Sequence, residues 1–447
     1  MTPIRTGLLV LTLVSGIGCA RSVATTRDPS RASFPSHIVY RHYEAPRNRE
    51  DGAATGGGLP LALTLDDRGN AWVLGEFHTH LQVVSDADSA LAARTIRIPH
   101  HPHAAPFASG HGGPSKRSML GEDLVVDRDG RVWISQGGGY LIHEGTNHSR
   151  VVSFDPESGD FAAYNLPGNG NEAMGLLWDE RRDLIWVAES AMDTLVAFDP
   201  DRAPHDNEFL WNKSLDGTLC PEPTPEPAGC FARYPLPDGA HRPAQLVGDP
   251  SGAIWFTLFW GAGIGRLDPD SGEVIVYSLA GGIGTDPRAK AVGPGPWDIA
   301  ISPDGEHVVW SEFFDSTVAR IPLARALDPE CRALVDDRNP CVEEMRIPGA
   351  AESQQVHSIA FDAFGNLWFT QFSFPHVPGV NNSIGFVTAD WSRVELLDPL
   401  EIGSNGSRSY ADIAIDPGTG DIWIAEFLPP GVGRLRLVNR EVDPATW

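Results

Sequence analysis

The chain of 447 residues is short of positive charge, with 34 lysines and arginines against 59 aspartates and glutamates and a net charge of -25 at pH 7. Such a surface repels phosphate backbones and acidic lipid head groups, and no local basic patch offsets it. We therefore exclude nucleic acid as a partner. The excess acid keeps an exported protein soluble, and it also attracts cations, so both interpretations stay open.

Signatures of several familiar enzyme classes are also missing. The sequence has no Gly-x-Ser-x-Gly nucleophile elbow, no phosphate-cradling Gly-x4-Gly-Lys loop, no Cys-x2-Cys-His haem site and no His-Glu-x2-His metal site. These absences narrow the options for an enzyme.

The apolar run near the start of the chain is short. It extends from Gly7 to Val14 behind a basic segment ending at Arg5, and it is too short to cross a bilayer as a helix. Residues 15–19 resemble a bacterial lipobox, in which Cys19 becomes the lipidated N-terminus, although Gly16 stands where leucine is preferred. We expect residues 1–19 to be a lipoprotein-type signal peptide and residues 20–36 a tether. This places the protein in the bacterial cell envelope, in the periplasm or at the outer membrane, with its anchor as the only membrane contact.

Cysteine is scarce too. After Cys19 only four remain, in two equally spaced pairs, Cys220 with Cys230 and Cys331 with Cys341. Two local disulfides are the simplest of three possible pairings and suit an oxidising compartment. A metal-thiolate site is the alternative, although the proline-rich stretch from Cys220 to Cys230 favours a stapled loop.

Glycine and proline are plentiful, with 47 and 37 residues beside 13 tryptophans, as is typical of short strands separated by tight turns. One pattern occurs seven times: alternating apolar residues, an Asp, a turn ending in Gly, and an apolar-Trp-apolar run, clearest over residues 359–369. It predicts a hairpin with a polar turn. The other copies lie at residues 66–72, 127–133, 179–186, 249–255, 303–310 and 416–423.

Two further apolar runs follow each hairpin except the last, such as residues 318–321 and 346–348. Four strands repeated seven times predict an all-β fold, a seven-bladed β-propeller of four-stranded blades over residues 37–447, with the repeats at about 60–440. The last copy has only three strands. We expect the segment 37–46 to close the last blade, and the cysteine pairs to lie on the face opposite the loops that join the blades.

Histidines are concentrated in one part of the chain, with eight of the fifteen between residues 78 and 148, in loops assigned to one face. Neutral imidazoles from several loops can bind Zn, Cu or Ni. Histidines in exposed loops need bind nothing, so both interpretations stay open. The candidate metal ligands are His78, His80, His143 and His148.

A second polar set recurs at fixed places in the repeat, near the centre of the ring. Crowded carboxylates have raised pKa values and invite a divalent cation such as Mg, Ca or Zn, or acid-base work. A water-filled channel of satisfied polar groups is the alternative. The candidate ligand-binding residues are Asp123, Gln245, Asp298, Gln371 and Asp412.

Residues 365–372 with 382–386, and residues 253–257 with 263–267, resemble the repeats of streptogramin B (virginiamycin B) lyases. The likeness covers roughly residues 60–440. It implies a seven-bladed propeller that opens a cyclic depsipeptide antibiotic by Mg-dependent elimination. It also implies two histidines, each just before the first strand of a late blade, with glutamates that bind the metal and assist.

The resemblance carries over in part. His357 stands at the place of the first family histidine and Glu426 near that of the last glutamate, and Glu312 is a third candidate catalytic residue. Ala411 occupies the place of the second histidine and Ser409 that of the metal-binding glutamate. The chain thus lacks acid-base and cation parts that the elimination needs.

Three functions from different classes remain. The first is an exported, monomeric propeller that binds a small molecule or an envelope protein on its loop-rich face without breaking a bond. The second is a metal-dependent carbon-oxygen lyase, which requires His357 and Glu426 to meet in one concave site. The third is a periplasmic metal-binding protein that uses the histidine-rich loops.

Overall fold

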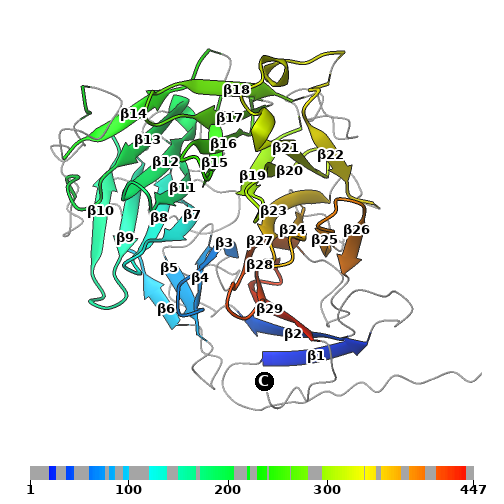
Figure 1. Ribbon diagram of the computed structural model, residues 1–447. Coiled ribbons are helices and arrows are strands. Elements are labelled where there is room, and N and C mark those ends of the chain that lie inside the picture. The colour runs from blue at the N-terminus through cyan, green and yellow to red at the C-terminus, as the bar shows by residue number, and fades with distance from the viewer. Residues whose placement is uncertain are drawn as a thin grey trace, which may run out of the picture.

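The computed structural model shows seven antiparallel sheets arranged around a common centre (Figure 1). The residues that the structure describes are 20–26, 37–44, 60–75, 80–85, 94–99, 120–137, 149–167, 172–205, 219–221, 229–238, 241–261, 263–279, 294–336, 338–348, 354–373, 382–397 and 409–438. The predicted seven-bladed propeller of four-stranded blades is confirmed.

Six blades are meanders of four consecutive strands. The strands of blades 1 to 3 are β3 (Pro60–Leu65), β4 (Ala71–Gly75), β5 (His80–Val84), β6 (Arg94–Arg97), β7 (Leu120–Val126), β8 (Val132–Gly137), β9 (Arg150–Phe154), β10 (Phe161–Asn165), β11 (Ala173–Asp179), β12 (Leu184–Glu189), β13 (Thr194–Phe198) and β14 (Phe231–Pro235). Those of blades 4 to 6 are β15 (Pro243–Gly248), β16 (Ile254–Leu258), β17 (Gly263–Leu267), β18 (Val274–Ser278), β19 (Pro296–Ile301), β20 (His307–Glu312), β21 (Thr317–Pro322), β22 (Glu343–Arg346), β23 (Gln355–Phe361), β24 (Leu367–Phe372), β25 (Ile384–Val387) and β26 (Val394–Leu397).

Blade 7 joins the two ends of the described chain. Its strands β27 (Ser409–Ile415), β28 (Ile422–Leu428) and β29 (Gly431–Val438) are completed by β2 (His37–Glu44), which pairs antiparallel with β29 over its whole length. The expected closing strand is therefore confirmed. The segment predicted to be a tether is not wholly irregular, because β1 (Ala20–Thr26) pairs with β2 as a fifth strand. Backbone groups on the outer edge of β2 find partners in this way.

The repeated Asp-turn-Trp pattern has a direct physical cause. In blade 6 the carboxylate of Asp362 accepts hydrogen bonds from the backbone N–H groups of Phe364 and Asn366 and from the indole Nε1 of Trp368, 2.9 Å away. The side chain thus holds the turn and pairs the only polar atom of a buried ring. Asp66, Asp127 and Asp249 make the same bonds to their own turns and tryptophans.

The seven repeat tryptophans are all buried and lie between neighbouring blades. First strands of successive blades lie side by side all the way round, from β3 and β7 to β27 and β3. The only helices in the described segments are short 3-10 turns, η1 (Ser190–Met192), η3 (Leu323–Arg325) and η4 (Pro329–Arg332). None of the described helices is long and apolar enough to cross a membrane.

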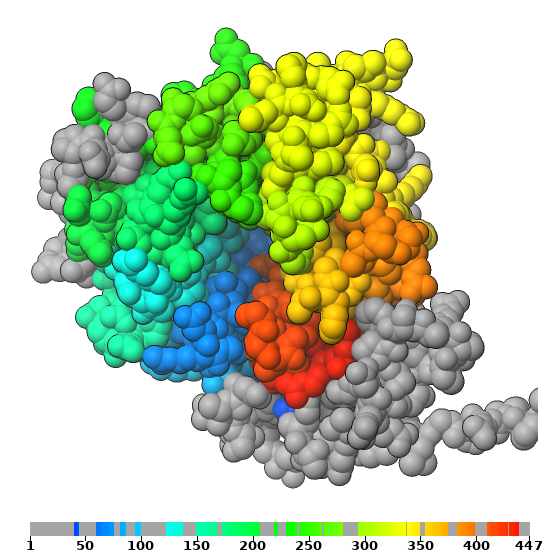
Figure 2. Space-filling view, in the orientation of Figure 1, coloured from blue at the N-terminus to red at the C-terminus, as the bar shows by residue number. Residues whose placement is uncertain are grey.

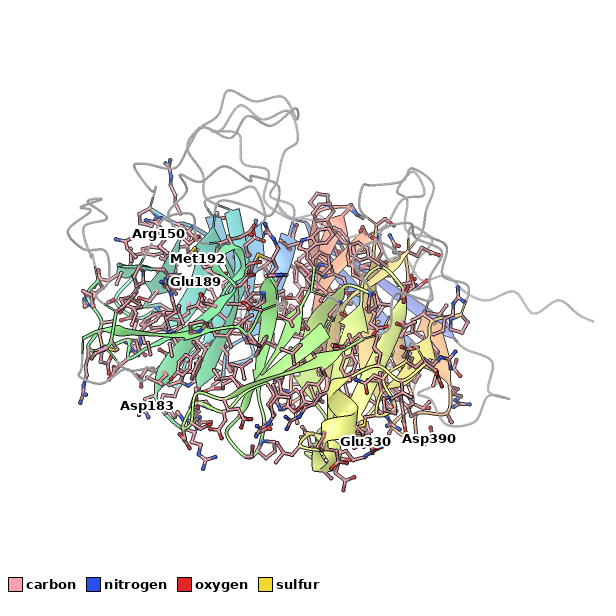
Figure 3. The ribbon with its side chains drawn as sticks, turned by 90° about the horizontal axis from the view of Figure 1, so that it is seen from above. Arg150, Asp183, Glu189, Met192, Glu330 and Asp390 are labelled. Atoms are coloured by element: carbon pink, nitrogen blue, oxygen red, sulfur yellow. A yellow bond between two sulfur atoms is a disulfide. The ribbon has the colours of Figure 1, made fainter. Side chains whose placement is uncertain are left out.

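The ring has two distinct faces (Figure 3). We call the face with Glu189 and Met192, at the β12–β13 connection, the loop face, and the face with Asp183, Glu330 and Asp390 the turn face. Disulfides join Cys220 to Cys230 and Cys331 to Cys341. Both lie between the third and fourth strands of their blades, as predicted, and Glu330 beside Cys331 marks the turn face. Two disulfides indicate an oxidising, extracytoplasmic compartment.

Candidate ligand-binding site

Irregular first strands place polar residues at the centre of the ring. In blades 2, 5 and 7 the pairing of the first strand with the second shifts register, for example between Pro296 and Ile299. Such a bulge turns a side chain away from the regular alternation of the strand. Asp123, Asp298 and Asp412 occupy these bulges, and Figure 2 shows the surface hollowed at the centre of the ring.

Each of these aspartates joins its blade to the next one. Asp123 accepts a hydrogen bond from the N–H of Leu176, 2.8 Å away, and Asp298 accepts one from that of Ile359, also at 2.8 Å. Asp412 accepts one from the N–H of Leu63, 2.6 Å away, across the junction of blades 7 and 1. The bonds satisfy main-chain donors in the bulges, so these side chains hold the ring together.

The three carboxyl groups influence one another. Burial raises the pKa of Asp412 to about 7, and the nearby charge of Asp298 adds to the rise. Burial also raises the pKa of Asp298, and it raises that of Asp123 well above its usual range, with the charges of Asp412 and Asp298 contributing. The expected crowding of carboxylates near the axis is present. A role for them in binding a ligand stays a prediction.

The two predicted glutamines have different surroundings. Gln371 is buried in blade 6, where its Oε1 accepts a hydrogen bond from the N–H of Ser383, 2.9 Å away. Gln245 lies in the bulge of β15, where its N–H donates to Oγ1 of Thr257 at 3.0 Å. Gln371 thus stabilises the pairing within its own blade.

Glu312 ends β20 and is buried inside blade 5. It accepts hydrogen bonds from Thr317 and, at 3.1 Å, from Nε1 of Trp310. Burial raises the pKa of Glu312 to about 8, and the neighbouring Glu344 adds to the rise. At neutral pH its carboxyl group is therefore largely protonated.

Glu426 lies near the end of β28 and belongs to the closure of the ring. Its two carboxylate oxygens contact the hydroxyl of Tyr40 and Nδ1 of His42, both on the closing strand β2. Glu426 is buried, and in these contacts it fastens the N-terminal strand to blade 7.

His357 lies in β23, in the bulge of blade 6, and is buried. Its Nδ1–H donates a hydrogen bond to the carbonyl oxygen of Ala411, 2.7 Å away, so the lone pair is on Nε2. Burial lowers the pKa of His357 to about 4. The ring is therefore neutral at physiological pH and is a weak base, and its Nε2 is able to accept a hydrogen bond.

Aromatic rings surround His357. The ring centres of Phe372 and Trp297 lie 5.0 Å and 5.1 Å from that of His357, and that of Phe313 lies 5.9 Å away. Neighbouring phenylalanines continue this contact from blade 4 to blade 7, with Phe259 next to Phe313 and Phe427 next to Phe372. We call Phe259, Phe313, Phe372 and Phe427, with Trp297, the aromatic arc.

The sequence interpretation missed the aromatic arc, although a signal for it exists. Each of the four phenylalanines lies at the end of the second strand in its blade or within one residue of it. They follow Leu258, Glu312, Gln371 and Glu426, and four successive repeats share this feature. The second strand of each blade ends at the loop face, so these four phenylalanines lie near that face. The four phenylalanines are buried and Trp297 is half-buried.

His357 and Glu426 have separate partners, the carbonyl of Ala411 and the strand β2, and no hydrogen bond joins them. Ser409, at the place of the family's metal-binding glutamate, is buried and accepts a hydrogen bond from the N–H of Ser373 at 3.1 Å. A shared catalytic role for His357, Glu426 and Glu312 stays a prediction.

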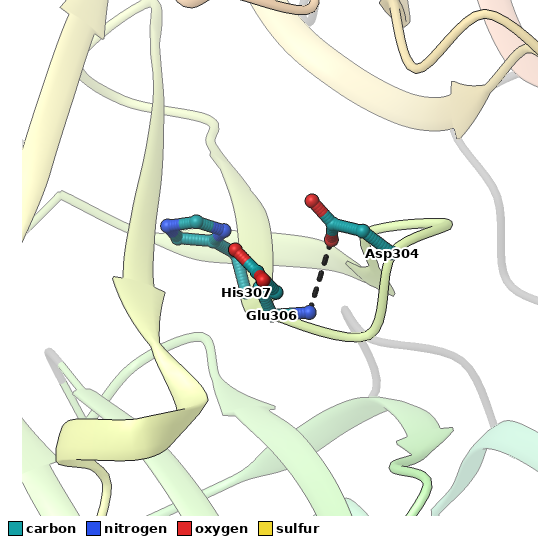
Figure 4. Close-up of side chains that lie close together, drawn as sticks. All are labelled: Asp304, Glu306 and His307. Carbon is teal, nitrogen blue, oxygen red and sulfur yellow. Dashed lines mark hydrogen bonds between the residues drawn. The ribbon is translucent and has the colours of Figure 1, made fainter.

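A group of possible metal ligands lies on the turn face. Within the described parts of the chain, Asp304, Glu306 and His307 place one possible ligand atom each within 4.8 Å of the others (Figure 4). The predicted ligands His78, His143 and His148, and the lipidation site Cys19, lie outside the described residues, and His80 is the first residue of β5.

Comparison with known proteins supports the fold. A streptogramin B lyase structure is 17% identical, with a TM-score of 0.60, and covers 90% of this chain and 98% of its own. A catalytically inactive virginiamycin B lyase from Staphylococcus aureus with quinupristin is 18% identical, with a TM-score of 0.60, and covers 89% of this chain and 100% of its own.

A chain of the mitotic checkpoint complex is 12% identical, with a TM-score of 0.53, and covers 97% of this chain and 100% of its own. No protein-family model and no curated protein sequence matches. The lyases and the chain of the mitotic checkpoint complex thus share this propeller fold, and the fold alone does not indicate an activity.

Proposed function

We propose that the protein is an exported, lipid-anchored and monomeric propeller that binds an apolar, ring-bearing ligand on its loop face, against the aromatic arc. The observation that carries this proposal is the state of His357, a neutral acceptor among aromatic rings with Nδ1 engaged by Ala411. Aromatic walls with one oriented polar atom are typical of small-molecule sites.

The state of His357 also favours binding over elimination. A general base works best with a pKa near the operating pH, whereas the pKa of His357 is about 4. Ala411 offers its carbonyl where a lyase of the resembling family has a histidine, and Glu426 is engaged by β2. The metal-dependent lyase remains the alternative function.

One experiment distinguishes ligand binding from metal-dependent elimination. Quinupristin, which accompanies the related lyase structure, is incubated with the full chain and Mg2+, with binding measured by calorimetry and the peptide examined by mass spectrometry. We expect binding without a linear product, weakened about tenfold by His357→Ala because a buried hydrogen bond is lost. Arg68→Ser, in the exposed turn of blade 1, is the control.

Formation of a linear product that disappears in His357→Ala would establish the lyase instead. Absence of binding at millimolar concentration would contradict this ligand class. The anchor is tested separately, since Cys19→Ser should move the protein from the membrane fraction to the soluble fraction. Elemental mass spectrometry of the dialysed protein tests for a resident divalent metal, the remaining alternative.

A further inference from the structure

A groove on the turn face lies between blades 5 and 6. Its volume is about 430 Å3, within the usual range for small-molecule sites. Blade 5 contributes Asp304, His307 and Arg320, and blade 6 contributes Phe361, Phe364 and Trp391. The groove is thus separate from the aromatic arc, which follows the second strands to the opposite face.

Phe364 is unusual among the repeats. It is 85% exposed at the tip of the β23–β24 turn. Arg68, Asp129 and Ser251 stand at the same place in blades 1, 2 and 4, since each donates its N–H to the carboxylate of the aspartate two residues earlier, as Phe364 does. The same turn therefore forms with a polar residue at this place, and folding does not explain the exposed Phe364.

Trp391 is a second aromatic residue in blade 6 that stands where other blades have a polar residue, in the turn between β25 and β26. The β25–β26 turn closes between Thr388 and Arg393, as the turns of blades 2 and 4 close between residues five apart. At the place of Trp391 those turns have Ser158 and Ser271. Trp391 also adopts a left-handed conformation, with φ 57°, which a bulky residue seldom does. Blade 6 thus carries aromatic rings where two sets of equivalent turns carry polar residues.

The charges around the groove are mainly negative. Arg320 stacks on Trp391, 4.5 Å from the ring centre, and its Nε donates to Glu343 at 2.8 Å, so its charge is neutralised. Asp304 is exposed, and its carboxylate accepts hydrogen bonds from the hydroxyl of Ser302 and from the N–H of Glu306. Figure 4 shows Glu306 and His307 beside it.

We propose that this groove is a second binding site, which takes a small organic amine with an aromatic or similarly flat apolar group. The ammonium group lies against the carboxylate of Asp304, and the apolar group lies against Phe364, Phe361 and the exposed part of Trp391. Opposite charge selects the amine, and apolar contact with the rings adds affinity.

Three probes of nearly equal size test this proposal: phenethylamine, 3-phenylpropanoate and 2-phenylethanol. Binding to the full chain is measured by ligand-observed NMR and by tryptophan fluorescence, with EDTA present so that no metal occupies Asp304, Glu306 and His307. We expect phenethylamine to bind most tightly, followed by the alcohol, and 3-phenylpropanoate to bind at least about fivefold more weakly than the amine.

Matched variants locate the site. Phe364→Ser introduces the residue that blade 4 has at this place, and it should weaken phenethylamine binding about fivefold through the loss of aromatic contact. Asp304→Asn should bring the amine and the alcohol to equal affinity. Arg68→Ser, at the equivalent tip of blade 1, is the control and should change nothing.

Phe364 is exposed, so its replacement leaves the fold intact, which circular dichroism verifies. Equal binding of the amine and the acid, or binding of phenethylamine that Phe364→Ser leaves unchanged, would overturn the proposal, as would the absence of saturable binding. Because quinupristin binding depends on His357 at the other face, this site can fail without affecting the proposed function, and the reverse also holds.

Discussion

At the scale of single residues, the buried His357 and Asp412 make stability depend on pH with opposite signs. Both groups prefer their neutral forms, because burial penalises charge. For a histidine this lowers the pKa, and for a carboxyl group it raises the pKa. The two groups therefore respond to pH in opposite directions.

For His357 the unfolded chain binds a proton between pH 6.5 and about 4, whereas the folded chain does not. The free energy of unfolding should therefore fall on acidification through this range, by at most about 1.4 kcal/mol per pH unit. Urea unfolding at several pH values measures the slope. His357→Gln should flatten it, and an unchanged slope in this variant would contradict the assignment of a buried neutral ring.

For Asp412 the free energy of unfolding changes with pH in the opposite direction. Its folded pKa of about 7 lies above the ordinary 3.8, so its contribution to stability is complete below pH 3.8 and is lost as the pH rises towards 7. Asp412→Asn should make unfolding less dependent on pH between 5 and 8. If Asp412 were ionised throughout this interval, the wild type and the variant would show parallel curves.

At the scale of strands, hydroxyl groups join one blade to the next. Oγ1 of Thr370 in β24 accepts the N–H of Ser358 at 3.1 Å and donates to the carbonyl of Ala411 in blade 7 at 3.0 Å. Ser311 makes the corresponding pair of bonds between blades 5 and 6, to Asp298 and His357. These bonds satisfy the main-chain groups that each bulge leaves unpaired.

Thr370→Val keeps the shape of the side chain and removes both bonds. It should lower the free energy of unfolding by about 1–3 kcal/mol, because a buried donor and a buried acceptor lose their partner. Thermal or urea unfolding measures the loss. Thr95→Val in the exposed strand β6 is the control and should change stability by less than about 0.5 kcal/mol.

At the scale of the whole molecule, the ring depends on one strand from the start of the chain. Without residues 37–46, β29 would present an unpaired edge and Glu426 would lose Tyr40 and His42. Deletion of this segment should lower the unfolding temperature and promote self-association at the free edge. Calorimetry and light scattering test this, and a monomer of unchanged stability would contradict the closure.

The sequence predicts the ring well and the site only in part. Hairpins with a polar turn and an apolar-Trp-apolar run are local patterns that occur seven times, so the number of blades, the closing strand and the faces of the disulfides follow from counting. Blade 5 departs from the pattern, because Ser302 stands at the place of the aspartate and Trp310 donates to Glu312 instead.

The bonds of Asp123, Asp298 and Asp412 depend on bulges and on the neighbouring blade, which no local pattern reveals. Glu426 contacts Tyr40, which is 386 residues away in the sequence, and this contact exists only after the ring has closed.

The closing strand also determines the order in which this protein is able to fold. β2 emerges early in synthesis, whereas its partner β29 emerges among the last strands, so blade 7 forms after all the others have been made. Closing so long a loop is entropically costly and slow. Until then β2 has no partner in the ring, so the last blade is completed only when strands from both ends of the described chain have been made.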